Sequence, residues 1–310
     1  MSIVKDGMYG FVIGDALGVP VEFRSRDSLL KDPVTEMIGY GSYYNIPEGV
    51  WSDDTSLTLA TMDSITKCHG INYQKMAECF CDWMNHGKYT ATGIVFDIGI
   101  TTKYALVRFY EDGIEACKCG GDAISENGNG SLMRMLPIVF YCYFKKLDDS
   151  KILEIVKNTS SITHAHEQSI MGCYIYVKYL LYLLNGYNKQ EAYELIKKVD
   201  YDVFSLETQE VYSRIISEDI SQKKIDEIIS SGYVVHTLEA SLWLILNHHS
   251  YDETILTAVN LGEDTDTVAA ITGSIVGILY GFDNINKSWI EKLKNKKLLD
   301  DIINHFEKEL

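Results

Sequence analysis

The sequence predicts an all-α fold. Apolar residues recur at helical spacing over segments of helical length, whereas the alternation typical of half-buried strands is scarce. Only four Pro residues occur among the 310, which suits a chain of many uninterrupted helices. No internal repeat, low-complexity tract or Pro/Gly/Ser linker divides the chain, so we expect one domain over residues 1–310.

The apolar periodicity also sets the expected order of elements. We expect helices over approximately 3–17, 54–68, 73–86, 97–111, 131–143, 149–159, 165–184, 188–199, 205–216, 222–230, 236–248, 252–261, 267–280, 286–294 and 297–308. The stretch from Val34 to Val50 is expected to be irregular or to form a short hairpin.

The charge balance restricts the classes of partner. Lys and Arg total 28 and Asp and Glu total 44, which gives a formal net charge of −16 at pH 7. This excess of negative charge argues against sequence-independent binding to nucleic acid or to an anionic membrane. A phosphorylated small molecule can still bind, through a local device such as a cation or a helix N-terminus.

The expected location follows from the start of the chain and from its cysteines. The first residues lack the basic-then-apolar pattern of a signal peptide, and no apolar run approaches the roughly 20 residues that span a bilayer. The seven Cys are odd in number and scattered, which fits reduced thiols. We therefore expect a cytoplasmic monomer. Two Cys-x-Cys pairs, at 79–81 and 117–119, each match half of a zinc site, but neither has a second matching pair.

The end of the first helix carries the first candidate residue. Gly18 and Pro20 there form an ordinary helix stop. A helix stop does not explain why Asp15 and Glu22 flank an otherwise apolar turn. Glu22 is therefore a candidate functional residue.

A pair of acids begins the next long helix. Ser52 or Asp53 can cap this helix, and the further acid Asp54 complements its dipole. Capping alone accounts for this arrangement unless the same chemistry appears elsewhere in the chain.

Three further segments of the middle of the chain carry polar residues of possible function. Asp97 lies between apolar neighbours and either caps the following helix or faces a site. The glycine-rich loop 126–131 opens a helix and can offer backbone N–H groups to a phosphate. Arg134, one turn further on, can balance the charge of a diphosphate or of a nearby carboxylate. His164 precedes a long apolar helix, where a structural hydrogen bond and a ligand contact are both open.

The segment Gly262 to Thr267 repeats the acid-and-hydroxyl chemistry of the helix at Ser52. It places three carboxylates and two threonine hydroxyls before a small, apolar helix, whereas capping needs only one such residue. Unpaired carboxylates within about 4 Å repel each other by several kcal/mol in a partly buried setting, and a divalent cation removes that cost. Oxygen ligands favour Mg²⁺, Mn²⁺ or Ca²⁺ over zinc. The two helix starts are therefore predicted to be two halves of one cation site.

Taken together, these motifs resemble the ADP-ribosylglycohydrolase family. The resemblance extends from about Tyr9 to Gly281. It is carried by Gly14-Asp15-Ala16-Leu17-Gly18 with Glu22, Trp51-Ser52-Asp53-Asp54-Thr55, Phe96-Asp97-Ile98-Gly99, Gly128-Asn129-Gly130-Ser131 with Met133-Arg134, Thr163-His164, Gly232-Tyr233-Val234-Val235 with Leu238-Glu239-Ala240, and Gly262 to Thr267.

The resemblance implies a compact, orthogonally packed all-α domain with two Mg²⁺ or Mn²⁺ ions at the base of a cleft. The implied metal ligands are Ser52, Asp53, Asp54, Asp264, Asp266 and Thr267. Glu22 would lie beside the metals and the ribose, and the ADP-ribose pocket would be lined by Asp97, Gly128, Asn129, Gly130, Ser131 and His164. The sequence departs from the family pattern at Ser52, where Thr is usual, and at His236, where close relatives tend to have Asp.

The resemblance further implies an enzyme that hydrolyses the bond between ADP-ribose and a modified side chain, with Asp53, Asp266 and either Glu22 or Asp97 in catalytic roles. Arginine-linked ADP-ribose on a protein is the expected substrate. The alternatives are serine-linked ADP-ribose, small conjugates such as O-acetyl-ADP-ribose, a metal-dependent phosphohydrolase, and a non-catalytic ADP-ribose-binding or crystallin-like structural relative.

Overall fold

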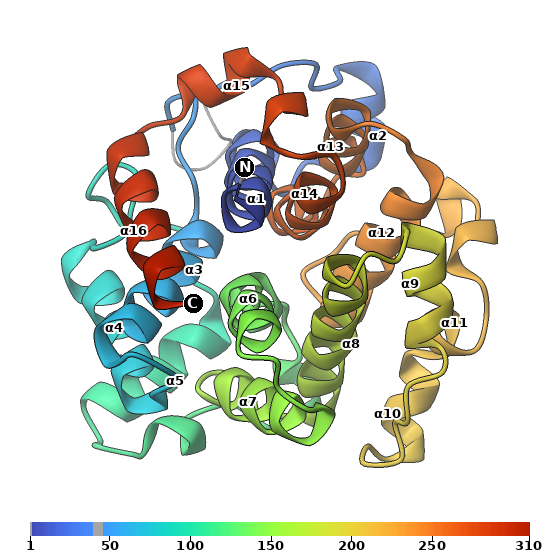
Figure 1. Ribbon diagram of the computed structural model, residues 1–310. Coiled ribbons are helices and arrows are strands. Elements are labelled where there is room, and N and C mark those ends of the chain that lie inside the picture. Colours follow the sequence, from blue (N-terminus) through green and yellow to red (C-terminus); the bar gives the residue numbers. More distant parts are fainter. Residues whose placement is uncertain (1, 40–45) are drawn as a thin grey trace.

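Helix α1 (Ile3–Gly18) and helix α14 (Thr265–Tyr280) pack against each other, although they come from opposite ends of the chain (Figure 1). The computed structural model describes residues 2–39 and 46–310. The remaining helices surround this pair in one compact helical body.

The prediction of an all-α fold is confirmed. The described residues contain no β-strand, and their only β-type pairings are isolated bridges, Gly121 with His164 and Gly128 with Tyr233. The other α-helices are α2 Arg26–Lys31, α3 Asp53–Cys68, α4 Tyr73–His86, α5 Ile100–Tyr110, α6 Leu136–Phe144, α7 Asp149–Ser161, α8 Glu167–Leu184, α9 Lys189–Ile196, α10 Leu206–Val211, α11 Ser213–Ile216, α12 Val234–Asn247, α13 Tyr251–Asn260, α15 Lys287–Lys292 and α16 Lys296–Glu309.

Glycines on one face of α1 allow the close approach of α14. A Cβ atom at Gly10 would lie 2.2 Å from the carbonyl oxygen of Gly273, and one at Gly14 would lie 2.1 Å from that of Ala269. At the end of α1, a Cβ atom at Gly18 would lie 2.3 Å from the Cα atom of Asp266. Backbone-to-backbone contact of this kind leaves no room for a side chain. It brings the end of α1 against the acidic start of α14.

The predicted helix over 222–230 is wrong. The structure has only two 3₁₀ turns there, Ile220–Gln222 and Ile225–Glu227. Arg26 donates hydrogen bonds to the carbonyl oxygens of Ile225 and Ile228, both at 2.7 Å, and Trp243 Nε1 donates to that of Lys223 at 2.8 Å. These distant side chains bind the carbonyls that an α-helix would use internally.

Other predicted boundaries shift for local reasons. The helix expected over 205–216 breaks at Tyr212, whose buried hydroxyl donates to the carbonyl oxygen of Gln168 at 2.7 Å. The helix expected from residue 97 begins at Ile100, because Asp97 has a left-handed φ of 54°. The helix expected from 131 begins at Leu136, after a 3₁₀ turn over Leu132–Arg134. Helix α2, which follows its N-cap Ser25, was not predicted.

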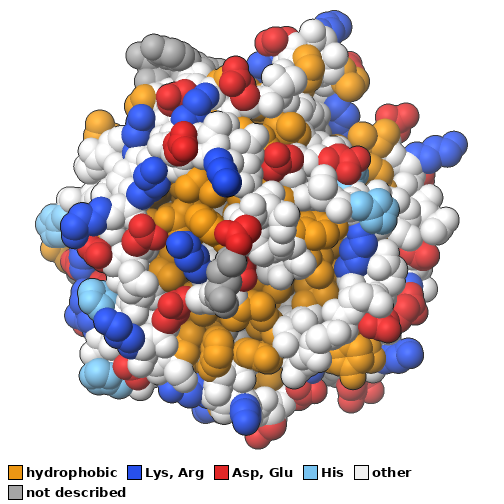
Figure 2. Space-filling model, turned by 45° about the horizontal axis from the view of Figure 1, so that its top comes forward, with side chains coloured by type: hydrophobic (Ala, Val, Ile, Leu, Met, Phe, Trp, Pro, Cys, Tyr) orange, Lys and Arg blue, Asp and Glu red, His pale blue; other side chains and the backbone are white. Residues whose placement is uncertain are grey.

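The predicted irregular stretch from Val34 to Val50 includes residues 40–45, which lie outside the described residues, and its described parts contain no strand. Within the described chain, no helix combines the length and the hydropathy needed to cross a bilayer. On the face shown in Figure 2, Lys and Arg side chains of the described residues are interspersed with Asp and Glu, and apolar side chains gather near the centre.

Candidate active site

Asp15, in the last turn of α1, holds the start of α3. Its Oδ1 accepts a hydrogen bond from the amide of Ser52 at 2.9 Å. Its Oδ2 accepts from the amide of Thr55 at 3.0 Å and from the Thr55 hydroxyl at 2.6 Å. The carboxylate is fully buried and satisfies amides that a helix N-terminus leaves without intrahelical partners. It thereby fixes Asp53 and Asp54, which lie between the two residues it binds.

The start of α14 is fixed to the same region by hydrogen bonds to backbone carbonyl oxygens. The hydroxyl of Thr265 donates to the carbonyl oxygen of Gly18 at 2.8 Å. The amide of Phe23 donates to the carbonyl oxygen of Glu263 at 2.7 Å, and the amide of Glu263 donates to that of Arg24 at 2.8 Å. Glu22 directly precedes Phe23, so these hydrogen bonds place it beside Asp264 and Asp266.

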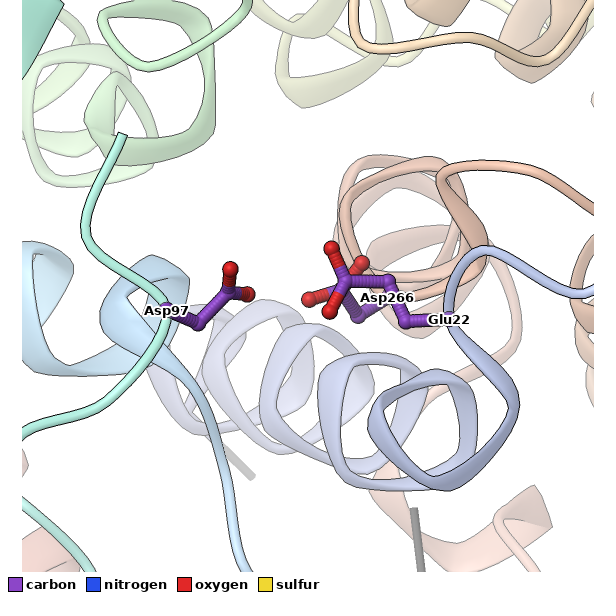
Figure 3. Close-up of side chains that lie close together, drawn as sticks. All are labelled: Glu22, Asp97 and Asp266. Carbon is purple, nitrogen blue, oxygen red and sulfur yellow. The ribbon is translucent and has the colours of Figure 1, made fainter. Parts of the chain in front are cut away.

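The acids from the two ends of the chain meet in one cluster. One carboxylate oxygen each from Glu22, Asp97 and Asp266 lies within 4.8 Å of the others. Figure 3 shows Asp97 reaching toward Glu22 and Asp266 from the opposite side of the cluster. Asp53, Asp54 and Asp264 line the same cleft, and the hydroxyl of Thr267 donates to Asp54 Oδ1 at 3.4 Å. The sequence analysis expected Glu22 beside the metals and the ribose and Asp97 in the ADP-ribose pocket, whereas the structure groups both carboxylates with Asp266.

Burial and mutual repulsion raise the pKa values of these acids. Burial, followed by the charges of Asp97 and Asp264, raises the pKa of Glu22 to about 10. Burial and the charge of Asp264 raise the pKa of Asp97 to about 6. Burial first, and neighbouring acids second, hold the pKa values of Asp53, Asp54 and Asp266 well above the ordinary range. Without a positive charge among them, these side chains resist ionisation.

The cluster has the donor chemistry of a site for a hard divalent cation. Asp54 Oδ2 and Asp266 Oδ1 are buried and have no hydrogen-bond partner among the described residues. None of the described residues that line the cleft is Lys or Arg. Buried, unpaired carboxylate oxygens are costly, and oxygen-rich sites suit Mg²⁺, Mn²⁺ and Ca²⁺. The residues present therefore fit such an ion.

The glycine-rich loop forms the other end of the cleft. The amide of Asn129 donates to the carbonyl oxygen of Gly232 at 3.0 Å, and Asn129 Nδ2 donates to Asp264 Oδ2 at 2.7 Å. The loop is thus fastened to the acidic start of α14. The amides of Gly128 and Gly130 have no acceptor among the described residues, and both glycines line the cleft. Such amides can bind an anion.

His164 lies beneath this loop with its imidazole beside Gly128 and Gly130. Its Nδ1 lies 2.7 Å from the hydroxyl oxygen of Thr163, which accepts a hydrogen bond from Arg134 Nη2 at 2.8 Å. Burial, with a smaller effect of Arg134, lowers the pKa of His164 to about 3, so the ring is neutral.

Arg134 and Ser131 are placed differently from expectation. Arg134 is fully buried beneath the loop, where it donates to the backbone oxygens of Gly130 and Thr159, so it supports the loop and does not face a phosphate. The hydroxyl of Ser131 lies in the core, 3.4 Å from Cys173 Sγ. Its side chain is not among those that line the cleft.

Several residues of the site were given no role from the sequence. Thr102 and Gly232 line the cleft, and Asp15 positions α3 from the core. His236, in contrast, does not line it. Its Nδ1 lies 2.8 Å from the hydroxyl oxygen of Ser231, and its ring contacts Tyr233 edge to face.

The cleft has a volume of about 270 Å³. A larger cavity of about 640 Å³ lies between α6, α7 and α8. It contains the buried Lys178, whose Nζ is paired with Asp149 Oδ1 at 2.6 Å, and none of the residues predicted to act. Because the acids and the glycine-rich loop meet in the smaller cleft, that cleft is the candidate active site.

Comparison with known proteins gives a consistent result. The family model for ADP-ribosylglycohydrolase matches residues 2–310. The chain is 33% identical over 301 residues to the ADP-ribosylarginine hydrolase Tri1 of Serratia proteamaculans, covering 96% of this chain and 77% of that protein. It is 34% identical over 289 residues to the protein of the same name from Pseudomonas putida, covering 93% of this chain and 73% of that protein.

More distant relatives extend the comparison. The ADP-ribosyl-[dinitrogen reductase] glycohydrolase of Rhodospirillum rubrum is 24% identical over 289 residues, covering 93% of this chain and 88% of that protein. A solved structure titled "ADP-ribosylglycohydrolase-related protein complex" has the same fold, with a TM-score of 0.82 and 24% identity, covering 99% of this chain and 97% of that one.

Proposed function

The chain belongs to the ADP-ribosylglycohydrolase family, and from this premise we propose that it hydrolyses the bond between ADP-ribose and a modified arginine side chain of a protein, in a reaction that depends on two Mg²⁺ or Mn²⁺ ions. The observation that carries the proposal is the meeting of Asp53 and Asp54 with Asp264 in a cleft that ends at the glycine-rich loop, with Asp266 buried close to Asp54 and Asp264. The names of the relatives at 33% and 34% identity support arginine as the linkage.

The ions would be held by Asp53, Asp54, Asp264 and Asp266, with the hydroxyls of Ser52 and Thr267. When bound, they would neutralise the carboxylates and polarise water and ribose oxygens. The unpartnered oxygens of Asp54 and Asp266 are the atoms of this set that most need a cation. The Thr267 hydroxyl donates to Asp54 Oδ1 at 3.4 Å, and the Ser52 hydroxyl accepts from the Asp54 backbone amide at 3.2 Å.

The rest of the cleft would bind and orient the nucleotide. The amides of Gly128 and Gly130 would bind the diphosphate. Because Thr163 Oγ1 accepts from Arg134, its proton is available to His164 Nδ1, which leaves an N–H at Nε2 to donate into the cleft. Binding energy from the diphosphate would then orient the ribose C1 atom at the carboxylate cluster.

Bond cleavage needs water delivered to C1 while positive charge develops on the sugar. The bond from C1 to the guanidine nitrogen breaks, a bond from C1 to the water oxygen forms, and a water proton ends on the leaving guanidine. Glu22 or Asp97 would accept that proton first, since both reach into the cluster. The carboxylates would also stabilise the oxocarbenium-like transition state.

Turnover of defined conjugates tests the linkage. The protein with Mg²⁺ is incubated with arginine-, serine- and acetyl-linked ADP-ribose, and the products are identified by mass spectrometry. We expect free ADP-ribose, fastest from the arginine conjugate. Release of AMP or phosphate would contradict the proposal in favour of a phosphohydrolase, and no product from any conjugate would favour a binding protein.

Variants test the role of the acids. Asp53→Ala and Asp266→Ala are each expected to abolish turnover while weakening ADP-ribose binding much less, because the bound nucleotide also contacts the glycine-rich loop. Turnover and ADP-ribose affinity are measured separately for each variant. Near-normal turnover of both variants in the presence of EDTA would contradict the metal mechanism.

A further inference from the structure

Apolar side chains that are exposed to solvent stand at the mouth of the cleft. Phe23 is 56% exposed and Ile100 is 75% exposed, and both line the cleft. Tyr104, which is 58% exposed, follows Ile100 by one turn on the same face of α5. We call these three residues the apolar rim.

The apolar rim flanks the carboxylate cluster on both sides. Phe23 directly follows Glu22, and α5 with Ile100 begins three residues after Asp97. In Figure 3, Asp97 and Glu22 enter the cluster from opposite sides. The bond to be cleaved lies at this cluster, so whatever ADP-ribose is attached to leaves the cleft between Phe23 and Ile100.

The backbone holds Phe23 at this position in an unfavourable conformation. Its φ of 64° lies in the left-handed region, which bulky residues rarely adopt. The hydrogen bond from its amide to Glu263, at 2.7 Å, and the one from Glu263 to Arg24 maintain that conformation. The same two hydrogen bonds position Glu22, which directly precedes Phe23. Strained backbone at a cleft is typical of functional positions.

The size of the cleft decides what the apolar rim can contact. A cleft of about 270 Å³ is smaller than most small-molecule sites, so it cannot admit a folded protein. If the substrate is a modified protein, its surface around the modified arginine must remain outside, against Phe23, Ile100 and Tyr104.

We propose that the apolar rim binds the protein surface around the modified arginine, so that the enzyme favours ADP-ribosylated proteins over free ADP-ribosylarginine. This proposal rests on the proposed function. The rim is continuous with the cleft, and exposed apolar side chains grouped at a site mark surfaces that bind another macromolecule. A contact of three side chains is small enough to release the product protein after each turnover.

The test compares two substrates of the same linkage. We measure kcat/KM for free ADP-ribosylarginine and for a protein mono-ADP-ribosylated on arginine, using the full chain with Mg²⁺. The variants are Tyr104→Ser, whose side chain does not line the cleft, and Ile100→Ser/Tyr104→Ser. The matched control is Leu206→Ser, an 82% exposed leucine at the start of α10 that does not line the cleft.

We expect Tyr104→Ser to reduce kcat/KM for the modified protein by about fivefold or more, with a change of less than about twofold for free ADP-ribosylarginine. The double variant should further lower the ratio of kcat/KM for the modified protein to kcat/KM for free ADP-ribosylarginine. Leu206→Ser should leave this ratio unchanged. If the wild type cleaves both substrates and the rim variants keep the wild-type ratio, the role of the rim is overturned and the proposed function stands. If the wild type cleaves neither substrate, the proposed function fails, and the role of the rim fails with it.

Discussion

At the scale of single residues, the site depends on buried polar side chains that position the residues facing the cleft. Asp15 accepts three hydrogen bonds from the start of α3, and Arg134 supports both Gly130 and Thr163 from below the glycine-rich loop. Neither side chain lines the cleft. The geometry of the groups that face the ligand therefore follows from buried polar contacts, which are strong when fully satisfied.

Gly130 illustrates how tightly the loop is fitted. A Cβ atom there would lie 2.8 Å from His164 Cε1 and 3.0 Å from Thr102 Oγ1. Because His164 is held at Nδ1 by Thr163, Gly130→Ala must displace either the ring or the loop. We expect the Kd for ADP-ribose, measured by calorimetry, to rise about tenfold, which corresponds to about 1.4 kcal/mol.

Gly99→Ala is the control for that substitution. Gly99 also lines the cleft, but its φ is −58°, and the nearest atom to a new Cβ would be Thr102 Oγ1 at 3.7 Å. We expect a change of less than about twofold in Kd. An equal loss in both variants would show that the fit to His164 is not the cause.

At the scale of elements, the sequence predicted most helices but few of their interruptions. Helix α4 has the predicted bounds, since its apolar period and its N-cap Asn72 are local signals. The failure at 222–230 arose because Arg26 and Trp243, distant in sequence, bind the carbonyls of that segment. No local pattern records such contacts.

The same distinction applies to the candidate site. The recurrence of acids and hydroxyls at Ser52 and Gly262 predicted two halves of one site, and the structure places both in one cleft. Asp15 was noticed but given no role, because its role depends on which helix packs against it. The left-handed conformation of Asp97 was equally invisible, since the local sequence favoured a helix start there.

The contact between α1 and α14 leads to a stability prediction. In Gly14→Ala, the new Cβ would lie 2.1 Å from a backbone oxygen of α14, so the helices must separate. We expect a loss of about 3 kcal/mol or more in the free energy of unfolding, measured by urea denaturation, and a loss of activity in the fraction that folds.

Gly7→Ala serves as its control on the same helix. There the closest atoms are the ring carbon Cζ of Phe140 at 2.9 Å and Cγ1 of Ile278 at 3.1 Å, both in side chains and neither in the backbone of α14. We expect a change of about 1 kcal/mol or less, since alanine also favours the helix. Equal stability of wild type and Gly14→Ala would contradict the proposed role of the glycine face.

At the scale of the whole molecule, folding brings acids from both ends of the chain together against their mutual repulsion. The pKa values of Asp15 and Asp97 are each raised to about 6, mainly by burial. A raised pKa in the folded state contributes stability that is present below the unfolded value near 3.8 and is lost as pH rises through about 6. The net charge of −16 acts in the same direction, because lower pH reduces self-repulsion.

We therefore expect the metal-free protein to become more stable as the pH falls from about 7 to about 5. Mg²⁺ should raise the melting temperature more at pH 8 than at pH 5.5, because the ion competes with protons for the carboxylates. Melting temperatures with EDTA and with Mg²⁺ at several pH values test this. Asp97→Asn should flatten the dependence, and a stability that rises with pH in EDTA would contradict this account.

Diffraction from a crystal grown with Mn²⁺ is the most direct test of the cation site, because anomalous scattering locates the ion without reference to activity. We expect anomalous peaks in the cleft, within bonding distance of carboxylate oxygens from Asp53 or Asp54 and from Asp266, which joins the two ends of the chain. A cleft without Mn²⁺ at a saturating concentration, or Mn²⁺ bound only at other acidic residues, would contradict the account.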